Sequence, residues 1–397
     1  MHGYRARSAF DGERFLPDGA LVLVEGSRIV GLEAASSAVP DGCPVTGLPG
    51  ATLLPGLIDA HVHLCGDAGP RALDQLPELT DDDLDGIVGA SMAASLAGGV
   101  TAVRDLGDAH WAVADRHRGR RLGPTVVAAG PPITTPDGHC AAMGGGATGE
   151  AGLRRAVRER VAHGVDVVKI MTSGGLMTRT TDVLACQFTL RELRAVVDEA
   201  HAAGLPVAAH AHPLAAVELC VAAEVDSIEH CTCMTADGLR LPPGLAEAIA
   251  AAGIVVSPTF ARVETAVPPH IRAALERAHM TWEDRYPQLA GLHAAGVTLI
   301  AGVDAGISPA KPHGIVAESV AELVRSGIPV AEALAAATSV AARACGIGDR
   351  TGRLAVGLEA DLLAVEGDPR TDVAALRAVS LVVSRGQRVT PAADAIS

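Results

Sequence analysis

The sequence predicts an α/β protein: a (β/α)8 barrel, or TIM barrel, with a small β-sandwich-like domain built from both ends of the chain. In the middle of the chain, short apolar runs rich in β-branched residues alternate with longer Ala-rich segments of helical pattern. This alternation is typical of parallel strands joined by helices. The two ends show only short strand and turn patterns. We therefore expect the barrel over residues 55–353 and the composite β-domain from residues 1–54 and 354–397.

Eight apolar runs are expected to form the barrel strands. They cover residues 53–61, 99–107, 124–130, 165–171, 205–212, 225–231, 253–260 and 297–306. Helix-like segments lie between them, such as residues 190–203, which Thr189 precedes as a candidate N-cap. In a (β/α)8 barrel the chemistry takes place at the carboxyl ends of the strands. A doubly wound open sheet is the second choice, but the Gly-rich phosphate turn that normally follows its first strand is missing.

Both ends of the chain carry patterns of short β-strands. Residues 20–33 predict a hairpin with Gly26 and Ser27 at its turn. Residues 354–366 and 378–388 predict further strands and turns. We expect these distant segments to build one β-domain beside the barrel.

Composition excludes several classes of function. The chain has 397 residues, of which 49% are hydrophobic, enough for a large buried core. Its net charge of −14 argues against a surface for nucleic acid or for an anionic membrane. We find no signal-peptide pattern and no apolar run as long as the roughly 18 residues of a membrane helix. The eight cysteines are scattered, with Cys231 and Cys233 as the closest pair, which favours reduced thiols in the cytoplasm.

Polar residues stand at the ends of five of the expected strands. In "DAHVHL", His61 and His63 are two residues apart, so both side chains point to one side of an extended chain. Each such residue alone has an ordinary structural interpretation, such as a core histidine, a snorkelling lysine or a helix-capping aspartate. Together, on the catalytic face of five strands, they predict a metal site. The candidates are His61, His63, Lys169, His210, His212, His230 and Asp304.

Imidazole and carboxylate ligands suit a divalent ion such as zinc, with open positions for water. Lys169 has no such role as an ammonium, but burial lowers the pKa of a lysine and leaves more neutral amine. Neutral amine can take up carbon dioxide and become a carbamate, which could bridge two metals about 3.5–4 Å apart. The only other lysine, Lys311 in "SPAKPHG", is expected to be an ordinary loop residue.

Motifs along nearly the whole chain resemble those of the amidohydrolase superfamily. They are similar to the branch that contains bacterial Xaa-Pro and Xaa-Arg dipeptidases and imidazolonepropionase-like hydrolases. The motifs are "PGLIDAHVHL" at 55–64, "GVTAVRDLG" at 99–107, "VVKIMTSGG" at 167–175, "VAAHAH" at 207–212, "VDSIEHC" at 225–231, "AGVDAG" at 301–306 and "GRLAVGLEADLLAVEGDP" at 352–369.

The resemblance implies a role for each candidate ligand. His61 and His63 would bind a buried metal together with Asp304, and Lys169, as its carbamate, would bridge two metals. His210 and His230 would hold the more exposed metal. His212 lies on the same face of its strand as His210, so it either replaces His210 as a ligand or lies behind the ligands.

The implied activity is hydrolysis of an amide-type C–N bond in a dipeptide, an N-acyl amino acid or a cyclic amide. A hydroxide bridging two metals, zinc by default, would attack the carbonyl, and Asp304 would move the proton to the leaving nitrogen. His139 in "PDGHC" matches a substrate-side histidine of the dipeptidase branch. Arg179 is either a clamp for a substrate carboxylate or solvated surface, and Arg104 is expected to be a structural ion-pair partner.

Three other functions compete with this hydrolase. A mononuclear deaminase of the same superfamily would do without the strand lysine, so Lys169 counts against it. A non-catalytic barrel that assembles with a partner would have lost metal ligands, and this chain has lost none. A biosynthetic enzyme that uses the same metals for dehydration or cyclisation stays open. The sequence predicts a small-molecule substrate without naming it and leaves a homo-oligomer open. Only 2% of residues are aromatic, which argues against a stacking pocket for a large flat ring.

Overall fold

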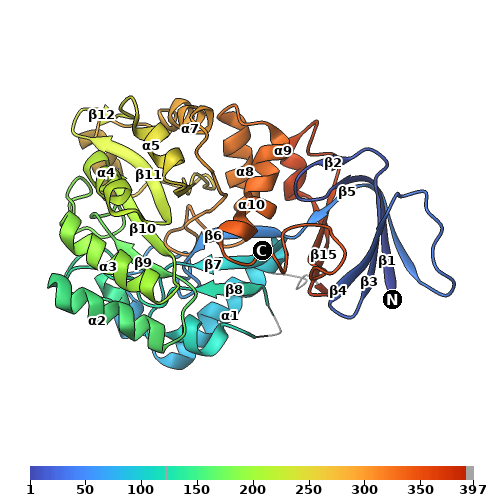
Figure 1. Ribbon diagram of the computed structural model, residues 1–397, viewed down its shortest axis with the longest axis horizontal. Helices are drawn as coiled ribbons and strands as arrows, with labels where there is room; N and C mark the ends of the chain where they lie inside the picture. The colour runs from blue at the N-terminus through green and yellow to red at the C-terminus, as the bar shows by residue number, and fades with distance from the viewer. Residues whose placement is uncertain (121–122, 390–397) are drawn as a thin grey trace.

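Parallel strands and helices alternate through the middle of the chain in the computed structural model, which describes residues 1–120 and 123–389. The protein is therefore a mixed α/β structure, as the sequence predicted. Figure 1 shows these elements as one body, with the strands of the amino-terminal segment beside it. None of the described helices is both long and apolar enough to cross a bilayer.

Two sets of parallel strands form the interior of the α/β body. One set has the order β6-β7-β8, and the other runs β9-β10-β11-β13, with β12 paired to β11 as an antiparallel addition. The strands are β6 (Leu57–Val62), β7 (Val100–Asp105), β8 (Thr125–Ala128), β9 (Val168–Met171), β10 (Val207–Pro213), β11 (Ser227–Thr235), β12 (Gly238–Leu239) and β13 (Val255–Ser257).

Isolated parallel bridges continue the pairing between and beyond these two sets. They join Ile133 to Ile170, Val256 to Leu299, and Val62 to Ala305. Through them, residues after β8 contact β9, and residues 299–305 contact both β13 and β6.

Seven of the eight expected runs contain a strand, but the eighth, residues 297–306, forms no regular strand. Some of its backbone N–H groups donate to groups outside the neighbouring strands instead of forming a regular strand ladder. The N–H of Ala301 donates to Ala336 O at 2.8 Å, and the N–H of Val303 donates to the Asp59 carboxylate at 2.9 Å. Sequence pattern marks an extended segment, but it does not show where the hydrogen bonds of that segment go.

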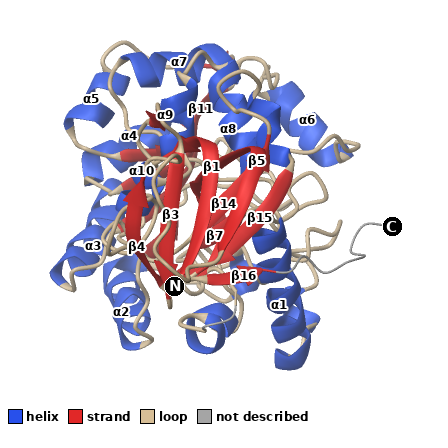
Figure 2. Ribbon diagram, turned by 90° about the vertical axis from the view of Figure 1, so that its right-hand side faces the viewer, coloured by secondary structure: helices blue, strands red, loops and turns tan. Residues whose placement is uncertain are grey.

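In Figure 2 the helices lie around the outside of the view, and the strands lie at its centre. The α-helices are α1 (Asp81–Ala97), α2 (Gly149–Ala162), α3 (Leu190–Ala202), α4 (Leu214–Ala223), α5 (Leu245–Ala251), α6 (Pro269–Arg277), α7 (Arg285–Ala294), α8 (Val316–Arg325), α9 (Val330–Ala336) and α10 (Ser339–Ala344). Short helical turns are η1 (Leu76–Glu78), η2 (Ala112–His117), η3 (Ala141–Met143) and η4 (Val373–Arg377).

Both ends of the chain contribute to one eight-stranded sheet, whose strands face the viewer in Figure 2. Its order is β16-β15-β14-β5-β1-β3-β4, with β2 paired to β1, and all pairs except β1 with β5 are antiparallel. The strands are β1 (His2–Phe10), β2 (Phe15–Leu16), β3 (Ala20–Glu25), β4 (Arg28–Glu33), β5 (Val45–Pro55), β14 (Leu362–Glu366), β15 (Val379–Ser384) and β16 (Gln387–Val389).

The hairpin predicted at residues 20–33 is confirmed, because β3 and β4 pair on either side of Gly26 and Ser27. The expected β-domain extends to residue 397, and its residues 390–397 lie outside the described part of the chain.

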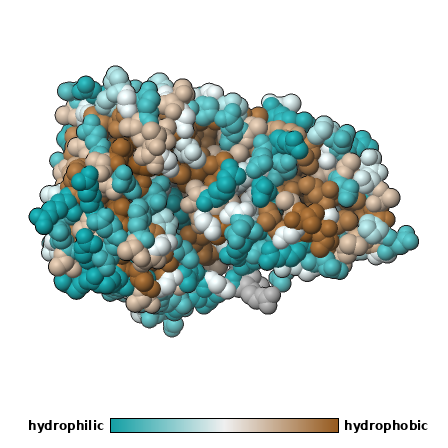
Figure 3. Space-filling model, viewed as in Figure 1, coloured by the Kyte–Doolittle hydropathy of each residue, from teal (hydrophilic) through white to brown (hydrophobic). Residues whose placement is uncertain are grey.

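Alternate residues of this sheet enter two different hydrophobic cores. Leu53 and Leu362 pack in a small core within the sheet, whereas their neighbours Leu54 and Leu363 pack in the large core of the α/β body. This is the period of two that a strand covered on both faces must show. Hydrophilic residues cover much of the surface in Figure 3, with hydrophobic residues visible between them.

The expected N-cap of α3 gives a test of local stability. Thr189 accepts a hydrogen bond from the N–H of Glu192, and the Glu192 carboxylate accepts from the N–H of Thr189, which completes a capping box. We expect Thr189→Ala to lower the free energy of unfolding by about 1 kcal/mol in urea denaturation, since a helix donor loses its partner. Ser36→Ala, at an exposed turn, is the control; equal stability of both variants would contradict the cap's role.

Candidate metal centre

Two clusters of three potential metal ligands lie at the carboxyl ends of the parallel strands. In each cluster the ligand atoms are within 4.8 Å of one another. The first cluster is His61, His63 and Asp304, and the second is His210, His212 and His230. The structure thus brings together the histidines and the aspartate that the sequence singled out.

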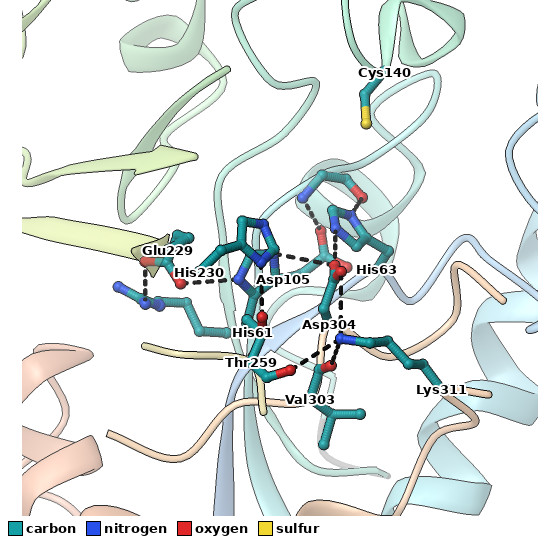
Figure 4. A network of polar contacts seen from close by, with 12 residues as sticks. His61, His63, Asp105, Cys140, Glu229, His230, Thr259, Val303, Asp304 and Lys311 are labelled. Atoms are coloured by element: carbon teal, nitrogen blue, oxygen red, sulfur yellow. Dashed lines mark hydrogen bonds and ion pairs between the residues drawn. The ribbon is translucent and has the colours of Figure 1, made fainter. Parts of the chain in front are cut away.

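The first cluster is organised around the Asp304 carboxylate (Figure 4). Asp304 Oδ1 lies 3.1 Å from His63 Nε2 and 3.4 Å from His61 Nε2. The other ring nitrogens are held from behind: His61 Nδ1 lies 2.9 Å from the Glu229 carboxylate, and His63 Nδ1 lies 3.1 Å from Gly107 O. Such outer contacts fix the orientation and tautomer of a ligating histidine.

A buried ion pair supports His61. Arg104 donates to Glu229 at 2.8 Å and to Ala60 O at 2.8 Å, so the expectation that Arg104 is a structural ion-pair partner is confirmed. Burial alone would raise the pKa of Glu229, but Arg104 and His61 hold it below its ordinary value. Glu229 therefore stays a carboxylate that accepts from His61.

Sequence reasoning missed Glu229. It directly precedes His230, so regular alternation would place its side chain on the opposite face of β11. His230 has a φ of 68°, which breaks that alternation. Both side chains consequently approach His61, whose ring centroid lies 5.3 Å from that of His230.

The second cluster joins two neighbouring strands. His212 Nδ1 lies 2.9 Å from Thr232 Oγ1, His230 Nδ1 lies 2.7 Å from Thr259 Oγ1, and His210 Nε2 lies 3.1 Å from Gly174 O. Each of the three rings thus uses one nitrogen in a hydrogen bond and keeps the other. The cluster contains both His210 and His212, as strand alternation predicted for their shared face.

Lys169 is the most unusual group in the centre. Its side chain is fully buried, and its Nζ has no hydrogen-bond partner among the described residues. Burial lowers its pKa to about 8, although Glu229 and Asp304 oppose that shift. An ammonium without a partner costs several kcal/mol in an interior, so this position fits a modified or ligating group better than a free cation.

The donor set fits a divalent cation. Burial is the main cause that lowers the pKa of His61 to about 4 and that of His212 to about 3, and it also lowers the pKa values of His210 and His230. These four imidazoles are therefore neutral at neutral pH, which is the form that binds metals. Lys169, whose Nζ has no partner among the described residues, lines the same cavity as both clusters.

Both clusters and Lys169 line one cavity of about 920 Å³. His139 and Arg179, the two expected substrate contacts from loops, also line it. The ring centroid of His139 lies 4.6 Å from that of His210, and its Nδ1 lies 2.8 Å from Thr178 Oγ1. Arg179 is exposed at the cavity.

The expectation that Lys311 is an ordinary loop residue was wrong. Its Nζ donates to Thr259 O at 3.0 Å and to Val303 O at 2.8 Å, and it lies 3.8 Å from Asp304 Oδ2 (Figure 4). Burial would raise the pKa of Asp304, but Lys311 first and His61 second lower it. The chain after residue 304 folds back over the site, and no spacing rule in the sequence predicts this return.

The low aromatic content argued against a stacking pocket for a large flat ring, but two aromatic residues do meet at the cavity. Phe260 and Trp282 stack with ring centroids 4.2 Å apart, and both line the cavity. Few aromatic residues in a chain do not prevent two of them from meeting at one site.

Comparisons with known proteins agree with this geometry. An uncharacterized protein of Mycobacterium tuberculosis is 32% identical over 363 residues, which cover 88% of this chain and 89% of that protein. An imidazolonepropionase of Stenotrophomonas maltophilia is 30% identical and covers 91% and 90% of the two chains. A solved Xaa-Pro dipeptidase with methionine bound in its active site superposes with a TM-score of 0.85 at 26% identity, covering 98% and 99%.

The family model described as "Amidohydrolase family" matches residues 52–389, which include every ligand of both clusters and Lys169. The chain therefore belongs to the amidohydrolase family, as its motifs predicted.

Proposed function

We propose that this protein is a metal-dependent hydrolase of amide-type C–N bonds, acting on a dipeptide, an N-acyl amino acid or a cyclic amide. One observation carries the proposal: two three-ligand clusters and the unpartnered Lys169 side chain line a single cavity. The imidazolonepropionase and Xaa-Pro dipeptidase among its similar proteins support hydrolysis of this bond type.

We also propose that the parallel strands close into a (β/α)8 barrel over residues 55–353. The bridges at Ile133–Ile170, Val256–Leu299 and Val62–Ala305 support this, because they connect the two parallel sets into a ring. Residues 1–54 and 354–397 would form the small β-sandwich-like domain. Its support is the small core shared by strands of both ends.

The eight free cysteines support a reducing compartment, the cytoplasm.

The proposed centre holds two divalent cations, zinc by default. His61, His63 and Asp304 would hold one, and His230 with His210 or His212 the other, while Lys169, as its carbamate, would bridge them. When bound, these cations would activate a water molecule and polarise the carbonyl oxygen of the amide.

The residues of the chain would then direct the proton. Asp304 is ionised and lines the cavity, with its Oδ2 3.8 Å from Lys311 Nζ, so it could accept the proton of the attacking water. Water oxygen bonds to the carbonyl carbon, the C–N bond breaks, and Asp304 returns the proton to the leaving nitrogen. His139 and Arg179, at the cavity, would contact the substrate.

Metal content tests the two-cation centre. Protein purified without chelator should contain close to two equivalents of divalent metal by elemental analysis. His63→Asn should lower that value because one cluster loses a ligand, whereas the surface variant His201→Asn should leave it unchanged. One equivalent of metal in the wild-type protein, with no carbamate on Lys169, would favour a mononuclear deaminase.

Lys169 tests the bridge. Lys169→Ala should lose most of its metal and activity, and added short carboxylic acids should restore part of both, since they can occupy the bridging position. Lys169→Glu should keep some metal but lose activity, because a displacement of about 1 Å can cost around a hundredfold in rate. Arg277→Ala, which removes an exposed cation, is the control. Full activity with both metals in Lys169→Ala would sink the assignment.

Arg104 tests the support behind His61. Arg104→Met leaves Glu229 buried without its main counter-charge, so the free energy of unfolding should fall by about 3–5 kcal/mol. Metal affinity should fall by roughly 10- to 100-fold, because His61 loses its fixed orientation. Adding Glu229→Gln to that variant should restore part of the stability. Wild-type stability and metal affinity in Arg104→Met would contradict this role.

A further inference from the structure

A buried guanidinium near the second cluster has no acidic partner. Arg285, the first residue of α7, is only 4% exposed. Its Nη2 donates to His230 O at 2.9 Å and to Pro258 O at 3.3 Å, and its Nε has no partner. Among the described residues, no carboxylate forms an ion pair with it. Because burying an unpaired charge is costly, this position calls for an anion that the chain does not supply.

Arg285 lines the same cavity as the metal clusters. Leaving aside Lys169, which would be an anion as its carbamate, the cavity lining contains four basic residues (Arg179, Arg262, Arg285 and Lys311) and two acidic ones (Glu264 and Asp304). In a protein with a net charge of −14, such a basic cavity attracts anions locally.

Lys311, another cation that lines the cavity, already has partners. Lys311 uses its ammonium on Thr259 O, Val303 O and Asp304. Arg285 differs, because all of its hydrogen bonds use one nitrogen and the rest of its planar fork is unused. A guanidinium with free donors matches the geometry of a carboxylate.

Aromatic rings line the cavity next to Arg285. The Arg285 guanidinium lies 5.7 Å from the centroid of the Phe260 ring, which stacks on Trp282. Arg262 covers Trp282 at 4.2 Å from its ring. Phe260, which is buried, and the half-buried Trp282 together form an aromatic wall of the cavity beside the unpaired cation.

We propose that Arg285 binds the carboxylate of the substrate, and that the substrate is an N-acyl amino acid whose apolar acyl group packs on the wall of Phe260 and Trp282. The inference rests on the proposed amide hydrolysis and narrows its three substrate classes to one. A dipeptide would bring a free ammonium into a mostly basic cavity, where Asp304 and the exposed Glu264 are the only acidic side chains among the described lining residues. A neutral cyclic amide would leave Arg285 without its anion.

Three matched compounds test the charge preference: N-benzoyl-leucine, its carboxamide N-benzoyl-leucinamide, and the dipeptide phenylalanyl-leucine. The metal-loaded wild-type enzyme should cleave N-benzoyl-leucine with a kcat/KM at least tenfold above the other two. Arg285→Gln should lower kcat/KM for N-benzoyl-leucine by roughly 10- to 100-fold, as expected for a lost charged hydrogen bond, and should change that of the carboxamide little. Arg277→Gln, an exposed change of the same type on α6, should preserve the preference.

The ratio between the acid and its carboxamide separates recognition from stability, because a purely structural Arg285 would affect both compounds alike. Arg285→Lys keeps the positive charge and a donor for His230 O and Pro258 O, so it should fold. It should also retain part of the preference for the acid over its carboxamide. If Arg285→Gln still prefers the acid over its carboxamide, the proposal is overturned. If the preference for the acid is lost in Arg179→Gln instead, Arg179 binds the carboxylate.

Binding provides a readout that does not depend on turnover. In calorimetry, 4-phenylbutanoate should bind the wild-type protein at least tenfold more tightly than 4-phenylbutanamide. This difference in affinity should be smaller in Arg285→Lys and absent in Arg285→Gln. If none of the amides is cleaved but this pattern holds, the proposed hydrolysis fails and the anion site stands. Equal binding of acid and amide to the wild-type protein would overturn the anion site.

Discussion

The burial of the Lys169 ammonium is the constraint on which the candidate centre depends. Its Nζ has no partner in the interior, and the imidazoles of both clusters lie along the same cavity. A free cation here would cost several kcal/mol and would repel any metal. Carbamylation would remove the positive charge, supply a carboxylate and complete both clusters at once. The position is thus destabilising for a plain lysine, and it would be favourable for the proposed carbamate.

A second buried charge, Arg104, holds the centre from below. Its guanidinium spans from β7 to Glu229 on β11 and to Ala60 on β6, so three strands are tied at the level just beneath the ligands. Glu229 neutralises Arg104 and at the same time orients His61. Because one carboxylate does both tasks, the metal-binding geometry of β6 and the packing of the parallel strands are physically coupled.

Local rules predicted the ligands well, since strand alternation alone places His61 with His63 and His210 with His212. What it could not predict depends on departures from regular backbone or on long-range folding. Glu229 and His230 can both approach His61 because the positive φ of His230 breaks the strand alternation, and residues 297–306 lose their strand to hydrogen bonds with Asp59 and Ala336. Lys311 reaches Asp304 because a loop folds back, and Phe260 meets Trp282 across 22 residues of sequence.

The centre and the groups proposed to select the substrate belong to different parts of the chain. The histidine ligands stand on or directly after strands whose backbone is held by parallel neighbours on both sides. Arg285, Phe260 and Trp282 instead lie in the segment that follows β13 and leads into α7. Loops carry specificity in such folds because they can change without moving the strands. The same metal chemistry could therefore serve different amides in related proteins, while in this chain the proposed anion site at Arg285 would tie the choice of substrate to its negative charge.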